Sequence, residues 1–285
     1  MNAEAGPNSG RKLFFGLFIF PLVIAVGMAV LLCSAVLLTH EEQTPETLIA
    51  AIKTGSPGRR WQKAFELSNE LNARKTGLRD DGVMREIIAI LANPDRYDPK
   101  TRSYMALALS HFDKPESIAA LRRSLAPNDP EVTLYILWAL GRLRAAQAAP
   151  EVAGFLQSDE AETRTMAAYV LGVIGNAKAV PALEMLLNDP VMDVRRNAAL
   201  ALARLGNASG LEVLEKMMQR SDLASENLSE NQIEAIMVNA GKGLALIPNP
   251  KSIRILEAVA REDKNLKVRQ AALDALAHLR KTDAG

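Results

Sequence analysis

The stretch that decides the fold is DPVMDVRRNAALALARLG, which runs from residue 189 to residue 206. Val194, Ala198, Leu202 and Leu205 follow one another in steps of four, four and three residues, which places all four on one face of an α-helix. The Asp-Pro pair at its start supplies an N-cap carboxylate and a residue suited to the first helical turn. The Gly-Asn pair that follows Leu205 suits a left-handed C-cap. The stretch therefore predicts one amphipathic helix with defined ends.

The same pattern recurs along the chain at a constant interval, the one that separates Leu171 from Leu202. Similar stretches begin at Asp129 and Asp159, and a shorter apolar helix is expected between them and after them, as in residues 180–187 and 211–218. A fixed period in the range of roughly 20–50 residues is the signature of stacked structural repeats. Three sets of residues keep the register: Leu109, Leu140, Leu171 and Leu202; Arg102, Thr133, Arg164 and Arg195; Phe112, Leu143, Ile174 and Leu205.

The register continues outward with two insertions. Leu244 follows Leu202 at a longer interval, and the excess falls in the polar segment 221–232. Leu67 precedes Leu109 by the same longer interval, with the excess in residues 71–82. We therefore expect an all-α, right-handed α-solenoid of about seven helix pairs over residues 46–285, without β-strands. The segment 221–232 is expected to lie on the surface, so that deleting about ten residues there would leave the fold intact.

A motif within the units adds a family resemblance. It appears as Asp193-Val194-Arg195, Ala198 and the segment 202–206, and again as Lys267-Val268-Arg269, Ala272, Leu276 and Leu279 without the final Gly. Thr133 and Met237 stand where the motif has Arg. The chain resembles the HEAT-like repeat family of the phycobilisome-lyase type over most of residues 46–280. The resemblance implies the fold, but that family includes scaffolds, adaptors and a few enzymes, so function has to come from the site.

No catalytic constellation accompanies the repeat in the sequence. One cysteine and three scattered histidines disfavour a disulfide framework or a metal cluster. Gly241-Lys242-Gly243 lacks the earlier Gly and the following Ser or Thr that a P-loop requires. The family's bilin lyases are soluble, and the iron-binding hydroxylases built from such repeats need several His-Glu pairs, whereas this chain has only His40-Glu41. We expect no enzyme activity, no cofactor and no metal.

The charge balance separates the chain from other functional classes. It has 34 basic and 33 acidic residues, a net charge of +1, and 48% hydrophobic residues. Disorder requires low hydrophobicity or a large net charge. A nucleic-acid-binding domain is usually strongly basic. Both classes are therefore disfavoured.

A long apolar stretch near the N-terminus predicts a membrane anchor. Residues 13–38 contain no charge, and about 20 apolar residues span a bilayer. Arg11 and Lys12 precede this stretch, so the positive-inside rule places residues 1–12 in the cytoplasm. Residues 39–45 would form a juxtamembrane linker. The solenoid would then be extracytoplasmic, on the periplasmic or outer face in a bacterium.

The outward face of the helix in 192–205 predicts a binding surface. If Val194 and Leu202 point inward, the outward face centres on Arg196, Leu200 and Ala203. The resemblance places second helices on the concave side, which would make the equivalent residues a partner-binding groove, unless they pack sideways against neighbouring helices. The groove residues are Leu107, Leu134, Trp138, Tyr169 and Leu200, with Arg142 and Arg204 at the rim.

A second cluster lies just beyond the apolar stretch. Arg59, Arg60 and Lys63 flank Trp61. They form either a solvated helix end or a contact with lipid headgroups or an acidic partner. Together with Arg11 and Lys12, Trp61 is the candidate membrane-interface residue.

Three functions remain open from the sequence. The first is a membrane-anchored scaffold or adaptor that binds a membrane-associated protein, as an accessory subunit of a complex. The alternative is a lyase-like enzyme or maturation factor that binds a ligand along the inner helices. A structural element of the envelope that acts by self-association is the third.

Overall fold

The structure is a computed structural model that describes residues 17, 19–39, 44–73 and 80–282. It divides into two compact units, Met1–Thr44 and Pro45–Gly285. The first unit contains helix α2, Phe20–Thr39, and the second contains helices α3 to α17. No β-strand occurs in the part of the chain that the structure describes, as expected.

Helix α2 does not confirm the expected membrane span over residues 13–38. Among the described residues, no helix is both long enough and apolar enough to cross a bilayer. Arg11 and Lys12 lie outside the described residues.

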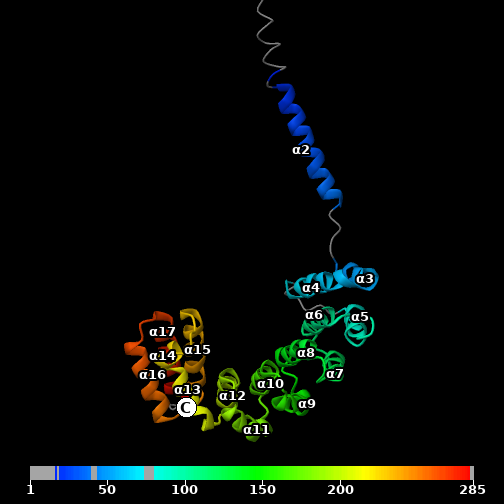
Figure 1. The fold of residues 1–285 in the computed structure, drawn as a ribbon. Coiled ribbons are helices and arrows are strands. Elements are labelled where there is room, and N and C mark those ends of the chain that lie inside the picture. The colour runs from blue at the N-terminus through cyan, green and yellow to red at the C-terminus, as the bar shows by residue number, and fades with distance from the viewer. Residues whose placement is uncertain (1–16, 18, 40–43, 74–79, 283–285) are drawn as a thin grey trace, which may run out of the picture. The chain divides into compact units, whose positions relative to one another are not determined.

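The described residues of the unit Pro45–Gly285 form a stack of seven helix pairs, which confirms the expected number. Figure 1 shows a curved array in which the second helix of each pair lies toward the inner side and the first helix toward the outer side. Neighbouring second helices pack directly on each other. The pairs are α3 (Pro45–Thr54) with α4 (Pro57–Ala73), α5 (Asp81–Leu91) with α6 (Pro99–Leu109), α7 (Pro115–Arg123) with α8 (Pro130–Arg142), α9 (Ala149–Gly154) with α10 (Ala161–Ile174), α11 (Val180–Met185) with α12 (Met192–Arg204), α13 (Leu211–Met217) with α15 (Glu230–Leu244), and α16 (Pro250–Glu262) with α17 (Leu266–Thr282). Short 3-10 turns flank α9 (Ala146–Ala148, Phe155–Gln157) and α11 (Ala177–Ala179, Leu186–Asn188), and one precedes α13 (Ala208–Gly210).

The repeated leucines form the core, as the register predicts. Leu109, Leu140, Leu171 and Leu202 are all fully buried between the first and second helices. Burying side chains of this size supplies the main stabilisation of each pair. The buried residues form two apolar clusters, one over α3 to α12 and one over α12 to α17, which meet at α12.

The predicted C-caps are also present. Gly175 and Gly206 have φ values of 81° and 71°, a left-handed conformation that costs glycine little. The chain turns in the same way at Arg144, one repeat before Gly175, with φ of 48°. The turn between helix pairs is therefore kept even where its glycine is missing.

Two register arginines, Arg102 and Arg164, join successive pairs, whereas Arg195 donates to the Asp189 and Pro190 carbonyls within its own pair. The Arg102 guanidinium binds Asp129, which caps α8, and donates to the Leu91 carbonyl. The Arg164 guanidinium binds Asp189 at the start of the next second helix. Asp189 is not the N-cap residue of α12, although its Asp-Pro sequence predicts one; it accepts a hydrogen bond from the Val191 amide instead. Arg102 and Arg164 therefore each link one helix pair to the next.

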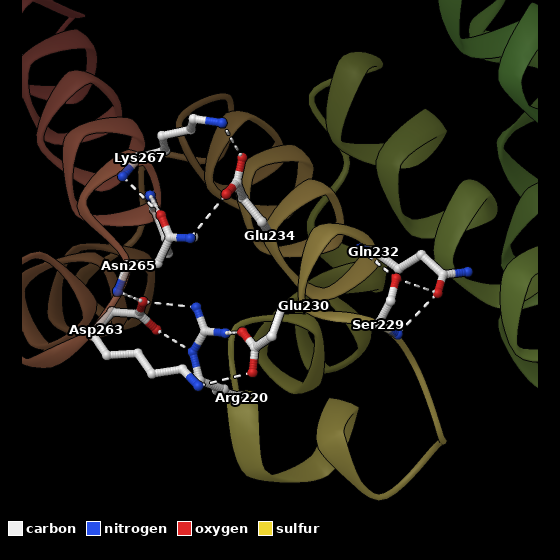
Figure 2. A network of polar contacts seen from close by, with 10 residues as sticks. Arg220, Ser229, Glu230, Gln232, Glu234, Asp263, Asn265 and Lys267 are labelled. Atoms are coloured by element: carbon white, nitrogen blue, oxygen red, sulfur yellow. Dashed lines mark hydrogen bonds and ion pairs between the residues drawn. The ribbon is translucent and has the colours of Figure 1, made fainter.

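The insertion at residues 221–232 lies on the surface as expected, with every side chain except Leu223 and Leu228 exposed, but it is also tied into the fold. It contains the end of the short helix α14, Arg220–Ala224, and buries Leu223 to 1% exposure. Figure 2 shows Arg220 reaching both Asp263, at 2.8 and 3.0 Å, and Glu230, at 2.9 Å. A capping box between Ser229 and Gln232 then starts α15. The segment therefore bridges the last two pairs.

The last pair leaves its outward stacking face uncovered. Leu273 of α17 is 50% exposed. The residues at the same register position in earlier pairs, Leu137, Ala168 and Ala199, are fully buried because the next pair packs against them. Among the described residues, no further helix pair packs on this face of α17.

Candidate functional site

The sequence-predicted groove residues lie on consecutive second helices. Leu107 is on α6, Leu134 and Trp138 on α8, Tyr169 on α10 and Leu200 on α12. Trp138 and Tyr169 are 36% and 38% exposed, whereas the three leucines are only partly exposed. Leu200 packs toward Gly243 of α15. The two aromatic rings are therefore the accessible part of the predicted set.

Two residues of the expected outward face are buried. Arg196 is 5% exposed, and its guanidinium binds Glu226 of the insertion at 2.7 Å and Asp193 at 3.1 Å. Ala203 is 1% exposed. A second helix contacts neighbours on both sides in the stack, so only a narrow stripe of its surface remains free.

Arginines cover the two exposed rings. The Arg142 guanidinium lies 5.6 Å from the ring centre of Trp138, one helical turn away on α8. The Arg204 guanidinium lies 5.1 Å from the ring centre of Tyr169, although Arg204 belongs to the next second helix. Burial lowers the pKa of Arg204, and Tyr169 opposes that shift. Both contacts are cation–π pairs, and they hold each guanidinium against the inner face.

His111 extends this arginine edge onto the end of α6. Its Nδ1 lies 3.2 Å from Nη2 of Arg142. A guanidinium can only donate, so Nδ1 accepts and the imidazole is neutral. Burial first and the Arg142 charge second lower the pKa of His111 to about 4. His111 therefore adds polarity to this edge without adding charge at neutral pH.

An aromatic ladder that sequence reasoning missed lies beside Trp138. The Tyr104 and Tyr135 rings meet edge to face at 6.1 Å, and Phe65 meets Tyr104 at 5.3 Å. Phe65 is 43% exposed. Tyr104 and Tyr135 are separated by one repeat interval, so the register itself carried the signal. We name Phe65, Tyr104, Tyr135, Trp138, Tyr169, Arg142 and Arg204 together the inner strip.

Trp61 lies at the beginning of the same face, on α4. The Lys100 ammonium is 3.5 Å from its ring centre. Nearby, the guanidiniums of Arg60 and Arg96 each lie 5.4 Å from the ring centre of Tyr97. Trp61 is thus covered by the Lys100 ammonium. The basic cluster expected around Trp61 includes Arg96 of the α5–α6 connection in addition to the residues of α4.

The inner face continues past α12 as a hollow of about 600 Å³ between α15 and α17. Its floor is apolar, with Val238, Ala271 and Ala275, and Lys242, Asp274 and His278 lie at its edge. Lys242 and Asp274 occupy the register position of Trp138 and Tyr169. Across the described residues, no group of three or more His, Cys, Asp or Glu side chains could hold a metal ion.

Comparison with known proteins places the fold in a family. The family model for HEAT repeats matches residues 84–169 and 152–229, which together span just over half of the chain. The chain therefore belongs to the HEAT-repeat family. No curated protein matches it.

Solved structures share this architecture at low sequence identity. The complex of CpcE and CpcF of phycocyanin lyase from Nostoc sp. PCC7120 matches with a TM-score of 0.56 and 18% identity, covering 85% of this chain and 96% of that one. The archaeal HEAT-like repeats protein from Thermococcus onnurineus NA1 matches with a TM-score of 0.47 and 15% identity, covering 85% and 99%. At these identities the likeness shows the fold alone.

Proposed function

We propose that this chain is a membrane-anchored scaffold or adaptor that binds a partner protein through the inner strip, as an accessory subunit of a membrane-associated complex. One observation carries the proposal: Trp138 and Tyr169 present partly exposed rings on successive second helices, each beneath an arginine. Trp, Tyr and Arg are the residues that most often dominate the binding energy of protein interfaces. An exposed apolar strip with a polar border is typical of an interaction site.

Trp138 and Tyr169 are not part of the buried core. Leu140 and Leu171, on the same helices as Trp138 and Tyr169, are fully buried and form the core of their pairs. The neighbouring second helices meet through small residues, as where Gly172 lies against Ala201. Packing therefore leaves the two rings available to a partner.

Anchoring in a membrane is part of the proposal. Its support is the uncharged run of residues 13–38 and the exposure of the described apolar side chains of α2. A helix that is apolar on all sides needs a non-aqueous environment. Arg11 and Lys12 would keep the N-terminus in the cytoplasm, with the repeats on the opposite side and Trp61 near the headgroups. Resistance of the chain to alkaline extraction from membranes tests the anchor, and release by alkali would overturn it. Digestion of the repeats by protease added to intact spheroplasts tests the orientation, and protected repeats would overturn it.

The binding function is tested by removing the two rings. The partner is first identified by affinity purification of the full chain in mild detergent. Trp138→Ala with Tyr169→Ala should then lose it while the melting temperature changes by only a few degrees. Met185→Ala on the outer helix α11 is the matched control, because Met185 is also apolar and exposed. Retention of the partner by the double variant would refute the inner strip as the binding site.

A second candidate function rests on the hollow between α15 and α17. Its volume of about 600 Å³ lies within the range of small-molecule sites, and its apolar floor and charged edge suit an amphipathic ligand. A ligand-binding, lyase-like role would use this part of the inner face. Colour in the purified protein, or a rise in melting temperature with a ligand that is lost in Ala275→Trp, would favour it over the adaptor role.

A further inference from the structure

The first two helix pairs carry basic side chains that face no carboxylate. In the part of the chain that the structure describes, four of them form no ion pair, and their charged groups lie at the surface. We name these four residues the cationic patch: Arg59 and Arg60 at the start of α4, Arg96 in the α5–α6 connection and Lys100 at the start of α6.

Two guanidiniums of the cationic patch are held in place by neutral acceptors. Arg60 donates from Nε to the Gly55 carbonyl at 3.0 Å and from Nη1 to the Arg96 carbonyl at 2.7 Å. Arg96 donates from Nη2 to the Lys53 carbonyl at 3.0 Å. Both guanidiniums lie 5.4 Å from the ring centre of Tyr97, which is buried. These contacts fix the two groups without cancelling their charge, so the remaining N–H groups can bind an anion.

The cationic patch lies where basic residues do not favour the helices. Arg59 and Arg60 are in the first turn of α4 and Lys100 is in that of α6, and neither turn contains an acidic residue. The N-terminus of a helix carries a partial positive charge, so acidic residues stabilise it and basic ones do not. Asp81 and Glu131 follow this rule in α5 and α8. The starts of α4 and α6 therefore add to the positive potential of the patch, which suits an anion.

Nearby carboxylates offset only part of this charge. Asp98 caps α6, where it accepts hydrogen bonds from the amide and the hydroxyl of Thr101. Asp95 is exposed in the α5–α6 connection. The neighbouring ammonium of Lys63 is paired with Glu66. The four cations of the patch therefore keep a net positive charge at the surface.

The attraction that this surface offers is electrostatic. Trp61 is partly buried, and the Lys100 ammonium lies 3.5 Å from its ring centre. The ring is therefore covered by a cation and does not present a free apolar surface. A partner is held by its negative charge, so binding should weaken as salt screens the two surfaces from each other.

The place of the cationic patch in the chain indicates which anion it meets. Helix α2 ends at Thr39 and α3 begins at Pro45, and the residues between them span at most about 20 Å. With the proposed anchor in a bilayer, so short a linker gives the first helix pairs a high effective concentration at the membrane surface. Basic side chains near a negatively charged bilayer are attracted to its phospholipid headgroups.

We propose that the cationic patch binds the headgroups of anionic phospholipids in the membrane that holds residues 13–38. This inference rests on the membrane anchor of the proposed function and adds a second contact with the same membrane. The contact orients the first two helix pairs on the membrane surface. An acidic protein is the competing occupant, and the experiments below separate the two.

Quenching of Trp61 measures this contact. The full chain with Trp138→Phe keeps Trp61 as its one tryptophan and is placed in nanodiscs that contain a phosphatidylcholine with a nitroxide on its headgroup. Replacing about a third of the other phosphatidylcholine by phosphatidylglycerol should increase quenching by about twofold or more at low salt. The increase should disappear at about 1 M salt, where the screening length is about 3 Å. Equal quenching in neutral and anionic discs overturns the inference.

Charge removal within the patch identifies the residues responsible. In the same background, Arg60→Gln with Arg96→Gln keeps side-chain N–H donors and should reduce quenching in anionic discs to the level of neutral discs. Arg261→Gln with Arg280→Gln is the matched control, because it removes the same charge from exposed positions on the last helix pair. Circular dichroism checks that both variants are folded. An equal loss of quenching in both variants would show that only net charge matters and overturns the patch.

The inference and the proposed function can fail separately. A chain that enters neither kind of disc refutes the anchor and the lipid contact together, whereas a chain that enters both with the same quenching refutes only the contact. Affinity purification in an uncharged detergent tests the competing occupant. If Arg60→Gln with Arg96→Gln loses the protein partner there, without anionic lipid, the patch binds an acidic protein and the lipid assignment is wrong.

Discussion

The guanidinium of Arg164 holds both carboxylate oxygens of Asp189, with Nε–Oδ2 and Nη2–Oδ1 distances of 2.8 and 3.0 Å. The two residues belong to successive helix pairs, and their side chains are 12% and 5% exposed. Burial raises the pKa of Asp189, but the hydrogen bonds from Arg164 and from the Val191 amide outweigh it, so the net pKa is lowered. The pair is therefore an ionised link between repeats.

Breaking this link should destabilise the array strongly. Asp189→Ala leaves the Arg164 charge buried without its partner, which costs about 3–5 kcal/mol. Chemical denaturation measures the loss. Lys216→Ala is the control, because the exposed Lys216–Glu212 pair should contribute less than about 0.5 kcal/mol. Equal losses in both variants would show that the link contributes no more than a surface pair.

Gly172 should not tolerate a methyl group. A Cβ at this position would stand 2.7 Å from the Ala201 Cα on the next second helix. Gly172→Ala should therefore cost about 1–3 kcal/mol by forcing α10 and α12 apart. Gly154→Ala, in helix α9 with nothing within 4 Å, should instead stabilise by about 0.5–1 kcal/mol. Thermal unfolding should show a lower melting temperature for Gly172→Ala and a higher one for Gly154→Ala if α10 and α12 approach as closely as described.

Replacing Arg144 by Gly should increase the stability of the protein. Its φ of 48° lies in the left-handed region, at the register position that Gly175 and Gly206 occupy in the next two turns. Arg144→Gly removes that strain and should stabilise by about 0.5–1 kcal/mol. Gly175→Ala should lose about 1–2 kcal/mol for the opposite reason. A loss in Arg144→Gly would mean that the side chain makes a contribution larger than the strain.

The insertion should be needed for stability, contrary to what its polar sequence predicts. Glu226→Ala removes one of the two carboxylate partners of the buried Arg196 guanidinium and leaves Asp193, which should cost about 1–3 kcal/mol. Leu223→Ala should cost about 2–3 kcal/mol through the cavity it leaves. Deletion of residues 221–232 should thus lower the melting temperature by well over ten degrees. An unchanged melting temperature after the deletion would show that the segment contributes little to stability.

His111 should make stability depend on pH between about 4 and 6.5. Its folded-state pKa of about 4 lies below the unfolded value of 6.5, so the unfolded chain binds the extra proton in this window. The folded state therefore keeps its full stability above pH 6.5 and loses it as the pH falls toward 4. Allowing for partial exposure, the loss should be about 2 kcal/mol. His111→Gln keeps an acceptor for Arg142, and a denaturation series should show that it removes most of this slope.

The sequence predicted the helix pairs because their core is periodic. The same residue type recurs at one register position, as Leu109, Leu140, Leu171 and Leu202. The α-helical spacing of the apolar residues around each leucine places it on the buried face of its helix. The C-caps at Gly175 and Gly206 followed from local chemistry alone. The apolar periodicity and the C-cap glycines are both local features of the sequence, so they can be recognised without knowing how the repeats stack.

The surface of the stack was less predictable. A helical wheel divides α12 into one buried and one exposed face, and it places Arg196 and Ala203 on the exposed face. Both residues are buried, because each second helix contacts the first helices and also two neighbouring second helices. Leu223 and Glu226 looked like part of a polar loop because their partners, in the core and at Arg196, lie in other elements. Tyr104 and Tyr135 were overlooked although their spacing repeats. Contacts between repeats depend on stacking geometry, which periodicity does not specify.

The uncovered face of α17 has a consequence for how the array opens. Among the described helix pairs, each interior pair contacts a neighbouring pair on two sides, whereas the pair of α16 and α17 contacts one neighbouring pair only, and Leu273 is half exposed. In a one-dimensional stack, opening starts where the fewest neighbours hold a unit. Amide protons of α17 should therefore exchange with deuterium sooner than those of α10, and proteolysis should shorten the array from this end, one pair at a time.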